Sequence, residues 1–143
     1  MNIFNYLNED AEHVSNMLHE TVDHFLTWDM DRVFEQSKKA LASLDEHLKK
    51  EKIVSNNLID NSELADSVSK SVEQTKAIKS DMNSLIMIHV DEPGYAKVLQ
   101  SMMEKLDEYR AYNQETFYPA IERTLSEDQF ASIKTQMEQV ALS

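Results

Sequence analysis

The sequence contains no cysteine, one glycine and only two prolines among 143 residues. The absence of cysteine excludes disulfide bonds, thiolate catalysis, thiolate-ligated iron–sulfur clusters and covalently attached c-type haem. The chain also lacks the Asn-Gly and Asp-Gly pairs that favour tight β-hairpin turns. Its long stretches rich in Glu, Lys, Leu, Met, Ala and Gln favour helix instead. We therefore predict an all-α protein.

Basic residues are also scarce, with 14 Lys and Arg against 26 Asp and Glu and a formal net charge of −12. A chain this acidic repels phosphate backbones and anionic lipid headgroups, so we expect neither nucleic acid nor a membrane as a partner. No apolar run approaches the roughly 20 residues that span a bilayer. The first ten residues lack the basic and apolar regions of a signal peptide, so we expect a cytoplasmic protein.

Apolar residues recur at helical spacing in five segments. Asp29 and either Asn61 or Ser62 are suited to cap the second and third helices, and Pro93-Gly94 predicts the turn before the fourth. Pro119 lies inside the fourth pattern and should kink or end it. Residues 126–129, Ser-Glu-Asp-Gln, fit a capping box for a last, short helix. The apolar stripes cover residues 4–25, 33–58, 64–86, 99–121 and 130–137.

Short connections between long amphipathic helices predict an up-down-up-down antiparallel four-helix bundle. The last pattern adds a short C-terminal fifth helix to this bundle. Neither an internal repeat nor a linker divides the sequence. We therefore predict a single domain that covers residues 1–143.

Polar residues interrupt three of the apolar stripes near their middle. His47 and Glu51 are four residues apart on the second helix, so one turn places them side by side. Thr75 interrupts the third stripe, and Tyr109 and Asn113 interrupt the fourth. We expect a buried polar layer whose members contact each other, water or a metal. The His–Glu pair suits either two ligands of one ion or a structural hydrogen bond.

The order of four segments resembles hemerythrin-like (HHE cation-binding) domains. Residues 3–14 are similar to the family's first helix, with its Leu-x-x-Asp-His-x-x-Val pattern. His47 and Glu51 match the family's His-x-x-x-Glu on the second helix, and residues 109–119 have the frame of the second such motif and its aromatic-Pro. Residues 125–130 are similar to the closing segment. The resemblance implies a four-helix bundle around two iron ions that binds oxygen or senses redox state or nitric oxide.

The resemblance also implies where iron ligands would lie. The second-helix pair is kept as His47 and Glu51, but the aromatic-Pro that should follow is replaced by Asn56-Asn57. The other ligand positions carry residues that do not replace an imidazole or a carboxylate. These vestigial positions are Ala11, Thr75, Tyr109 and Asn113.

We therefore predict that the diiron site is lost and that no cofactor is bound. In this hypothesis a hydrogen-bonded layer replaces the metal, with the Tyr109 hydroxyl donating to Glu51 and with Asn113 and Thr75 as further partners. The protein would act through an unknown protein partner or through self-association. The sequence has no catalytic motif, so we expect no enzyme.

Two alternatives stay open at this stage. A reduced metal site of His47, Glu51 and Tyr109 would suit a metal-dependent sensor or carrier of oxygen, nitric oxide or iron. A dimer could instead form through exposed apolar residues such as Trp28 and Phe34. We expect the basic cluster of Lys49, Lys50 and Lys52 to lie on a solvated helix face, and His19 and Asp107 to be surface positions.

Overall fold

Helices make up most of residues 2–142, which are the residues that the computed structural model describes. No strand occurs among them, so the prediction of an all-α protein is confirmed. In chain order the elements are α1 (Ile3–Asp23), α2 (Met30–Leu58), the 3₁₀ turn η1 (Ser62–Leu64), α3 (Ala65–Met87), α4 (Pro93–Tyr112), the π-helical turn η2 (Asn113–Phe117), α5 (Tyr118–Thr124) and α6 (Glu127–Leu142).

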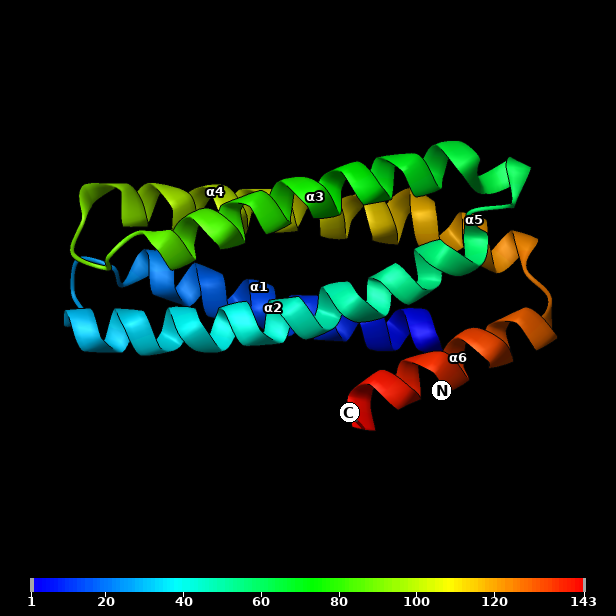
Figure 1. Cartoon of the computed structure of the whole chain (residues 1–143), viewed down its shortest axis with the longest axis horizontal. Coiled ribbons are helices and arrows are strands. Elements are labelled where there is room, and N and C mark those ends of the chain that lie inside the picture. Colours follow the sequence, from blue (N-terminus) through cyan, green and yellow to red (C-terminus); the bar gives the residue numbers. More distant parts are fainter. Residues whose placement is uncertain (1, 143) are drawn as a thin grey trace.

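Helices α1–α4 lie side by side along the longest axis of the molecule (Figure 1). Helix α1 packs against both α2 and α4, α3 packs mainly against α4, and α6 covers part of α2. The α1–α2 and α3–α4 connections lie together at one end, and α6 lies toward the other (Figure 1).

Side-chain caps fix several helix starts where the sequence predicts them. Asp29 accepts a hydrogen bond of 2.8 Å from the Arg32 amide at the start of α2. Asn61, rather than Ser62, caps the turn before α3 by accepting from the Glu63 amide at 3.0 Å. The capping box before α6 is confirmed, because the Ser126 amide donates to Gln129 Oε1 at 2.9 Å and the Gln129 amide donates back to Ser126 Oγ at 3.3 Å.

Pro119 changes the helix that contains it, as its position predicts. Proline has no N–H group and its ring clashes with the preceding turn, so an α-helix cannot continue regularly through it. The chain widens over residues 113–117 into the π-helical turn η2, and the Tyr118 amide donates to the Asn113 carbonyl five residues back. Helix α5 then starts with Pro119 in its first turn.

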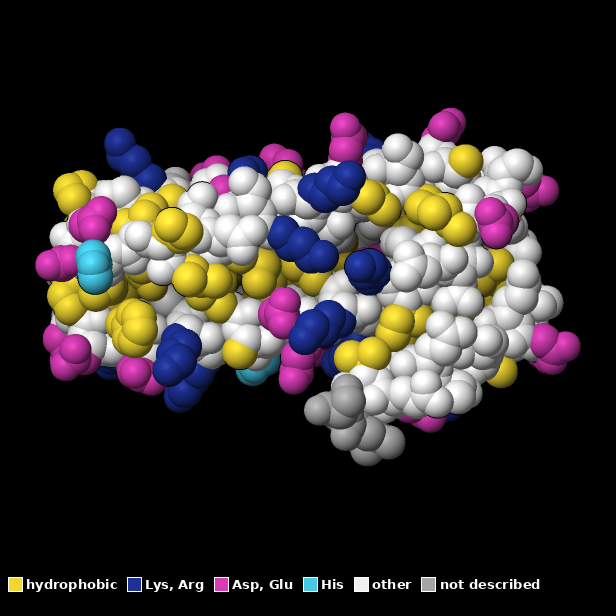
Figure 2. All heavy atoms as spheres, viewed as in Figure 1, with side chains coloured by type: hydrophobic (Ala, Val, Ile, Leu, Met, Phe, Trp, Pro, Cys, Tyr) yellow, Lys and Arg dark blue, Asp and Glu magenta, His cyan; other side chains and the backbone are white. Residues whose placement is uncertain are grey.

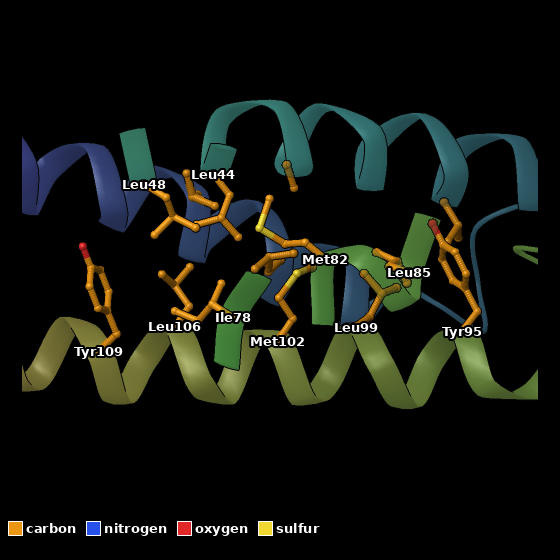
Figure 3. Packing of buried hydrophobic residues seen from close by; sticks show 14 residues of the cluster. Leu44, Leu48, Ile78, Met82, Leu85, Tyr95, Leu99, Met102, Leu106 and Tyr109 are labelled. Carbon is orange, nitrogen blue, oxygen red and sulfur yellow. The ribbon is translucent and has the colours of Figure 1, made fainter. Parts of the chain in front are cut away.

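Two apolar clusters fill the interior. The first extends between Tyr95 and Tyr109 of α4 and includes Leu44 and Leu48 of α2 (Figure 3). The second joins Phe4 and Leu7 of α1 to the η2–α5 region and to α6. Apolar side chains thus pack at both ends of the interior, and a band of mostly polar positions separates the two clusters.

Two surface predictions are wrong in detail. Trp28 is only half exposed, since it packs against the first cluster, stacks on His24 at 5.0 Å and carries the Arg32 guanidinium 4.0 Å above its ring. The sequence predicts Lys50 on a solvated face, but only 6% of it is exposed, and its Nζ lies 4.8 Å from the centre of the Tyr6 ring. Phe34 is exposed as expected. No helix in the described part of the chain has the length and apolar character needed to cross a membrane.

Leu106 offers a test of the core packing. It is fully buried in the first cluster, so Leu106→Ala removes apolar contacts and leaves a cavity. We expect this change to lower the free energy of unfolding by about 2–5 kcal/mol, measured by urea denaturation and circular dichroism. Leu26, which is exposed, is the matched control, and Leu26→Ala should change stability by no more than about 0.5 kcal/mol. Equal effects of the two changes would contradict this packing.

Candidate functional site

The polar layer lies where the two apolar clusters meet. Helix α2 contributes His47 and Glu51, which are fully buried, and α4 and η2 contribute Tyr109 and Asn113, also fully buried. Ala11 of α1 is buried as well, with Asp10 next to it in sequence. Five of the six predicted positions are therefore buried in the interior, and Thr75 is the sixth.

His47 is held on both sides of its ring. Its Nδ1 lies 2.8 Å from Asp10 Oδ2, and its Nε2 lies 2.9 Å from the Tyr109 hydroxyl. Because an ionised carboxylate only accepts hydrogen bonds, Nδ1 carries a hydrogen and donates it to Asp10. The Tyr109 ring meets the imidazole edge-on, with 5.8 Å between the ring centres. One imidazole therefore links α1, α2 and α4.

Asp10 is the partly exposed end of this chain of hydrogen bonds. Burial by itself would raise the pKa of its carboxyl. The hydrogen bond from His47, together with the positive charges of His47, Lys50 and His13, outweighs burial and holds the pKa below its ordinary value of 3.8. Lys50 Nζ lies 3.9 Å from Asp10 Oδ2 and donates to the Tyr6 hydroxyl. The buried Lys50 is thus part of the surroundings of the layer.

Glu51 has a partner that the sequence does not predict. The Tyr118 hydroxyl donates a hydrogen bond to Glu51 Oε2 at 2.8 Å, and the hydroxyl of Tyr109, the predicted partner, also acts on Glu51 by lowering its pKa. Tyr118 also accepts from Asn113 Nδ2 at 3.3 Å. In a regular α-helix residues 113 and 118 point in different directions, but the wider π-helical turn brings residues five apart onto one face. The turn that precedes Pro119 therefore brings Tyr118 into the site.

Burial governs the ionisation of the inner groups. It raises the pKa of Glu51 above 4.5, although the charge of His47 and the tyrosine hydroxyls act in the opposite direction. Burial and the nearby Glu51 charge also raise the pKa values of Tyr109 and Tyr118 well above 10. Glu51 Oε1 and Asn113 Oδ1 have no hydrogen-bond partner among the described residues. A protonated Glu51 would add a donor to a layer that has more acceptors than donors.

Helix α3 contributes less than the sequence predicts. The Thr75 hydroxyl donates to the Val72 carbonyl of its own helix at 2.9 Å, and the side chain is half-buried. Ser71 is the fully buried polar residue of this helix, and its hydroxyl has no partner in the described part of the chain. Lys70 lies 4.5 Å from the Tyr112 ring, so this part of α3 is next to the end of α4. Ser71 was missed because Val72 completes the apolar stripe equally well in the sequence.

The donor set does not match what two iron ions require. A diiron centre of the resembled type uses imidazoles and carboxylates from four helices, whereas this layer has one imidazole and one fully buried carboxylate. Both nitrogens of His47 are already engaged within the protein. Among residues 2–142 no group of three or more His, Cys, Asp or Glu side chains is arranged to hold a metal ion. A metal site at His47 and Glu51 stays a prediction, and the described residues add no third His, Cys, Asp or Glu ligand to it.

A second set of polar contacts joins α1 to α4 outside the layer. Asp107 accepts from Ser15 Oγ at 2.7 Å, and its other oxygen lies 2.7 Å from His19 Nε2. His19 and Asp107 were predicted to be surface positions, and both are partly exposed. No local pattern in the sequence predicts that they pair, because they lie 88 residues apart.

Comparisons of this chain with protein-family models, with characterised proteins and with solved structures found no match.

Asp10→Asn tests the role of the carboxylate beside His47. The variant keeps an oxygen acceptor for Nδ1–H but loses the charge, so we expect a loss of about 1–2 kcal/mol at neutral pH. A lowered pKa stabilises the fold above the unfolded-state pKa, and this contribution is lost as the pH falls. The stability gap between wild type and variant should therefore narrow below about pH 3.8. Urea denaturation at several pH values measures it, with exposed Glu12→Gln as the control. A gap that is independent of pH would contradict this assignment.

Glu51→Gln tests the buried carboxyl. A raised pKa means that the folded state binds the proton more tightly, so wild-type stability is lost as the pH rises above about 4.5 toward the folded-state pKa. Glutamine keeps the shape and cannot ionise. We expect the free energy of unfolding of the variant to rise relative to that of wild type across this range, by about 1–2 kcal/mol at neutral pH. Exposed Glu46→Gln on the same helix should not change the pH profile. A variant that becomes less stable relative to wild type as the pH rises would show that the charged form of Glu51 is needed.

Proposed function

We propose that this chain is a hemerythrin-like up-down-up-down four-helix bundle in which a hydrogen-bonded layer has taken the place of a diiron centre, and that it acts as a non-enzymatic protein-binding or regulatory module. The packing of α1 on α2 and α4 and of α3 on α4, with short connections between these helices, supports the bundle arrangement. The order of the motifs in the sequence supports the family.

The observation that carries the proposal is the contact between the Tyr109 hydroxyl and His47 Nε2, at 2.9 Å. In many metal sites a carboxylate holds one ring nitrogen of a histidine and leaves the other nitrogen free for the ion. Asp10 holds Nδ1 of His47 in the same manner. The phenol of Tyr109 then occupies the side of the ring where an ion would bind. The layer is therefore better suited to hold helices together than to hold iron.

The burial of the layer supports a non-enzymatic role. Glu51, Tyr109 and His47 are at most 1% exposed, so a substrate would have no direct access to their polar atoms. A module of this kind would meet its partner through its surface, and the interior would serve to keep the helices in register.

The competing function is a metal-dependent sensor or carrier with iron bound by His47, Glu51 and Tyr109. Glu51 Oε1, which has no partner in the described structure, is the atom that favours it. Such a site would require the Tyr109 hydroxyl to leave Nε2 of His47 and to lose its proton, although burial raises the pKa of that hydroxyl. This requirement makes the metal-free module the better supported proposal.

Elemental analysis and visible spectroscopy of protein grown with added iron distinguish the two functions. We expect iron, zinc and manganese far below one ion per chain, and a visible spectrum without absorption bands. An iron–tyrosinate band or oxo-bridged ferric absorption, with near-stoichiometric iron, would overturn the proposed function in favour of the sensor. Tyr109→Phe is the matched variant, because it keeps the aromatic ring and removes the hydroxyl oxygen that could bind iron. If an iron–tyrosinate band occurs in the wild type, this variant should abolish it.

A further inference from the structure

Large apolar side chains gather on the surface at one end of the molecule. Among the described residues six such side chains are exposed, and five of them belong to the α1–α2 connection, the start of α2 and the end of α3. These segments meet at the end that lies away from α6 (Figure 1). We call this group the end patch; it consists of Leu26, Met30, Phe34, Ile86 and Met87. The sixth residue, Ile59, lies in the α2–α3 connection instead.

The end patch exceeds what the fold requires. Leu26 is 94% exposed and Met87 is 84% exposed, so neither contributes much to the core. Half-buried residues of the same segments, such as Phe25 and Ile88, pack against the first apolar cluster. The exposed side chains therefore continue from the core to the surface, which is typical of an interaction site rather than of scattered surface residues.

A hollow lies next to Leu26. It has a volume of about 250 Å³ and opens between the end of α1 and the start of α4. Its lining is mostly apolar and consists of Val22, Phe25, Leu26, Ala96, Leu99 and Gln100. Such a hollow suits an apolar side chain that projects from a partner helix.

The charge around the end patch is negative. Within residues 24–36 and 86–96 there are five exposed acidic residues, namely Asp29, Asp31, Glu35, Asp91 and Glu92. The same ranges contain two exposed histidines, His24 and His89, and a single Lys or Arg residue, Arg32, whose guanidinium lies over the Trp28 ring. Figure 2 shows hydrophobic and acidic side chains together at this end, with a His and a few Lys or Arg side chains beside them, while more Lys and Arg side chains gather near the middle of the same face.

We propose that the end patch binds a cationic amphipathic helix of a partner protein, an inference that rests on the proposed function of this chain as a protein-binding module. The apolar side of such a helix would cover Leu26 and Met87, and its Lys and Arg residues would face the surrounding carboxylates. A symmetric contact between two copies would bring two acidic ends together, which disfavours a second copy as the occupant. Anionic lipid is disfavoured for the same electrostatic reason.

A fluorescently labelled synthetic peptide tests the proposal directly. The peptide carries leucines at i, i+3, i+4 and i+7 and lysines elsewhere, and fluorescence anisotropy measures its binding to the full chain. Two control peptides separate charge from shape: one has glutamates in place of the lysines, and one has the same composition in scrambled order. We expect only the cationic amphipathic peptide to bind, with an affinity that falls as salt is added.

Paired protein variants locate the binding surface. Leu26→Ser combined with Met87→Ser removes exposed apolar surface without touching the core, and should weaken binding at least about tenfold, equivalent to about 1.4 kcal/mol. Ile59→Ser makes the same kind of change elsewhere on the surface and should leave the affinity unchanged. Asp31→Asn with Asp91→Asn should weaken binding mainly at low salt.

Several results would overturn the proposal. These are no binding of the cationic peptide, equal binding of the scrambled peptide, or equal losses in the Ile59 variant and the end-patch variant. Sedimentation equilibrium tests whether the end patch binds a second copy of this chain. A dimer that the combined Leu26→Ser and Met87→Ser variant abolishes would assign the patch to self-association. None of these outcomes depends on the metal content of the protein. If the protein is free of metal and the cationic peptide does not bind, the end-patch proposal fails but the proposed function stands. Stoichiometric iron, in contrast, would refute the proposed function whatever the result of the peptide experiments.

Discussion

The structure depends on how one buried imidazole is satisfied. His47 lies in the interior, where an unpaired polar group would cost several kcal/mol, and it contacts Asp10 of α1 and Tyr109 of α4. These two contacts determine which turns of α1, α2 and α4 lie at the same level. The apolar clusters on either side are less specific, because leucine and methionine side chains can pack in more than one register. The polar layer therefore supplies the specificity of the interior, and the apolar clusters supply most of its stability.

The π-helical turn is the second constraint, and it acts on the same layer. Pro119 prevents a regular helix, and the widened turn before it places Tyr118 on the inner face beside Asn113. Tyr118 can then donate a hydrogen bond to the buried carboxyl group of Glu51. A backbone irregularity thus provides a hydrogen bond that side-chain spacing alone would not predict. Such irregularities are common at functional sites, and here the irregularity serves the packing of a polar core.

Much of the fold could be predicted from local chemistry. The cap at Asp29, the capping box at Ser126 and Gln129 and the interruption at Pro119 each depend on a few neighbouring residues, and each is found where the sequence places it. The candidate site was predicted less well. Tyr118 is a partner of Glu51 that the sequence does not predict, and Ser71 is more deeply buried than Thr75. Lys50 and Trp28 were assigned to the surface because their aromatic and charged partners lie on other turns or on other helices.

The sequence by itself determined the helical class, the helix caps and the presence of polar residues on apolar stripes, because these depend on composition and on spacing within one helix. Only the tertiary structure decided how those polar residues pair. Asp10 and Tyr109 reach His47 across 37 and 62 residues, and no local pattern records such a contact. The same holds for the surface, where the α1–α2 connection, the start of α2 and the end of α3 bring exposed apolar side chains to one acidic end. Pairing and surface proximity follow from the way helices pack, which is a property of the whole chain.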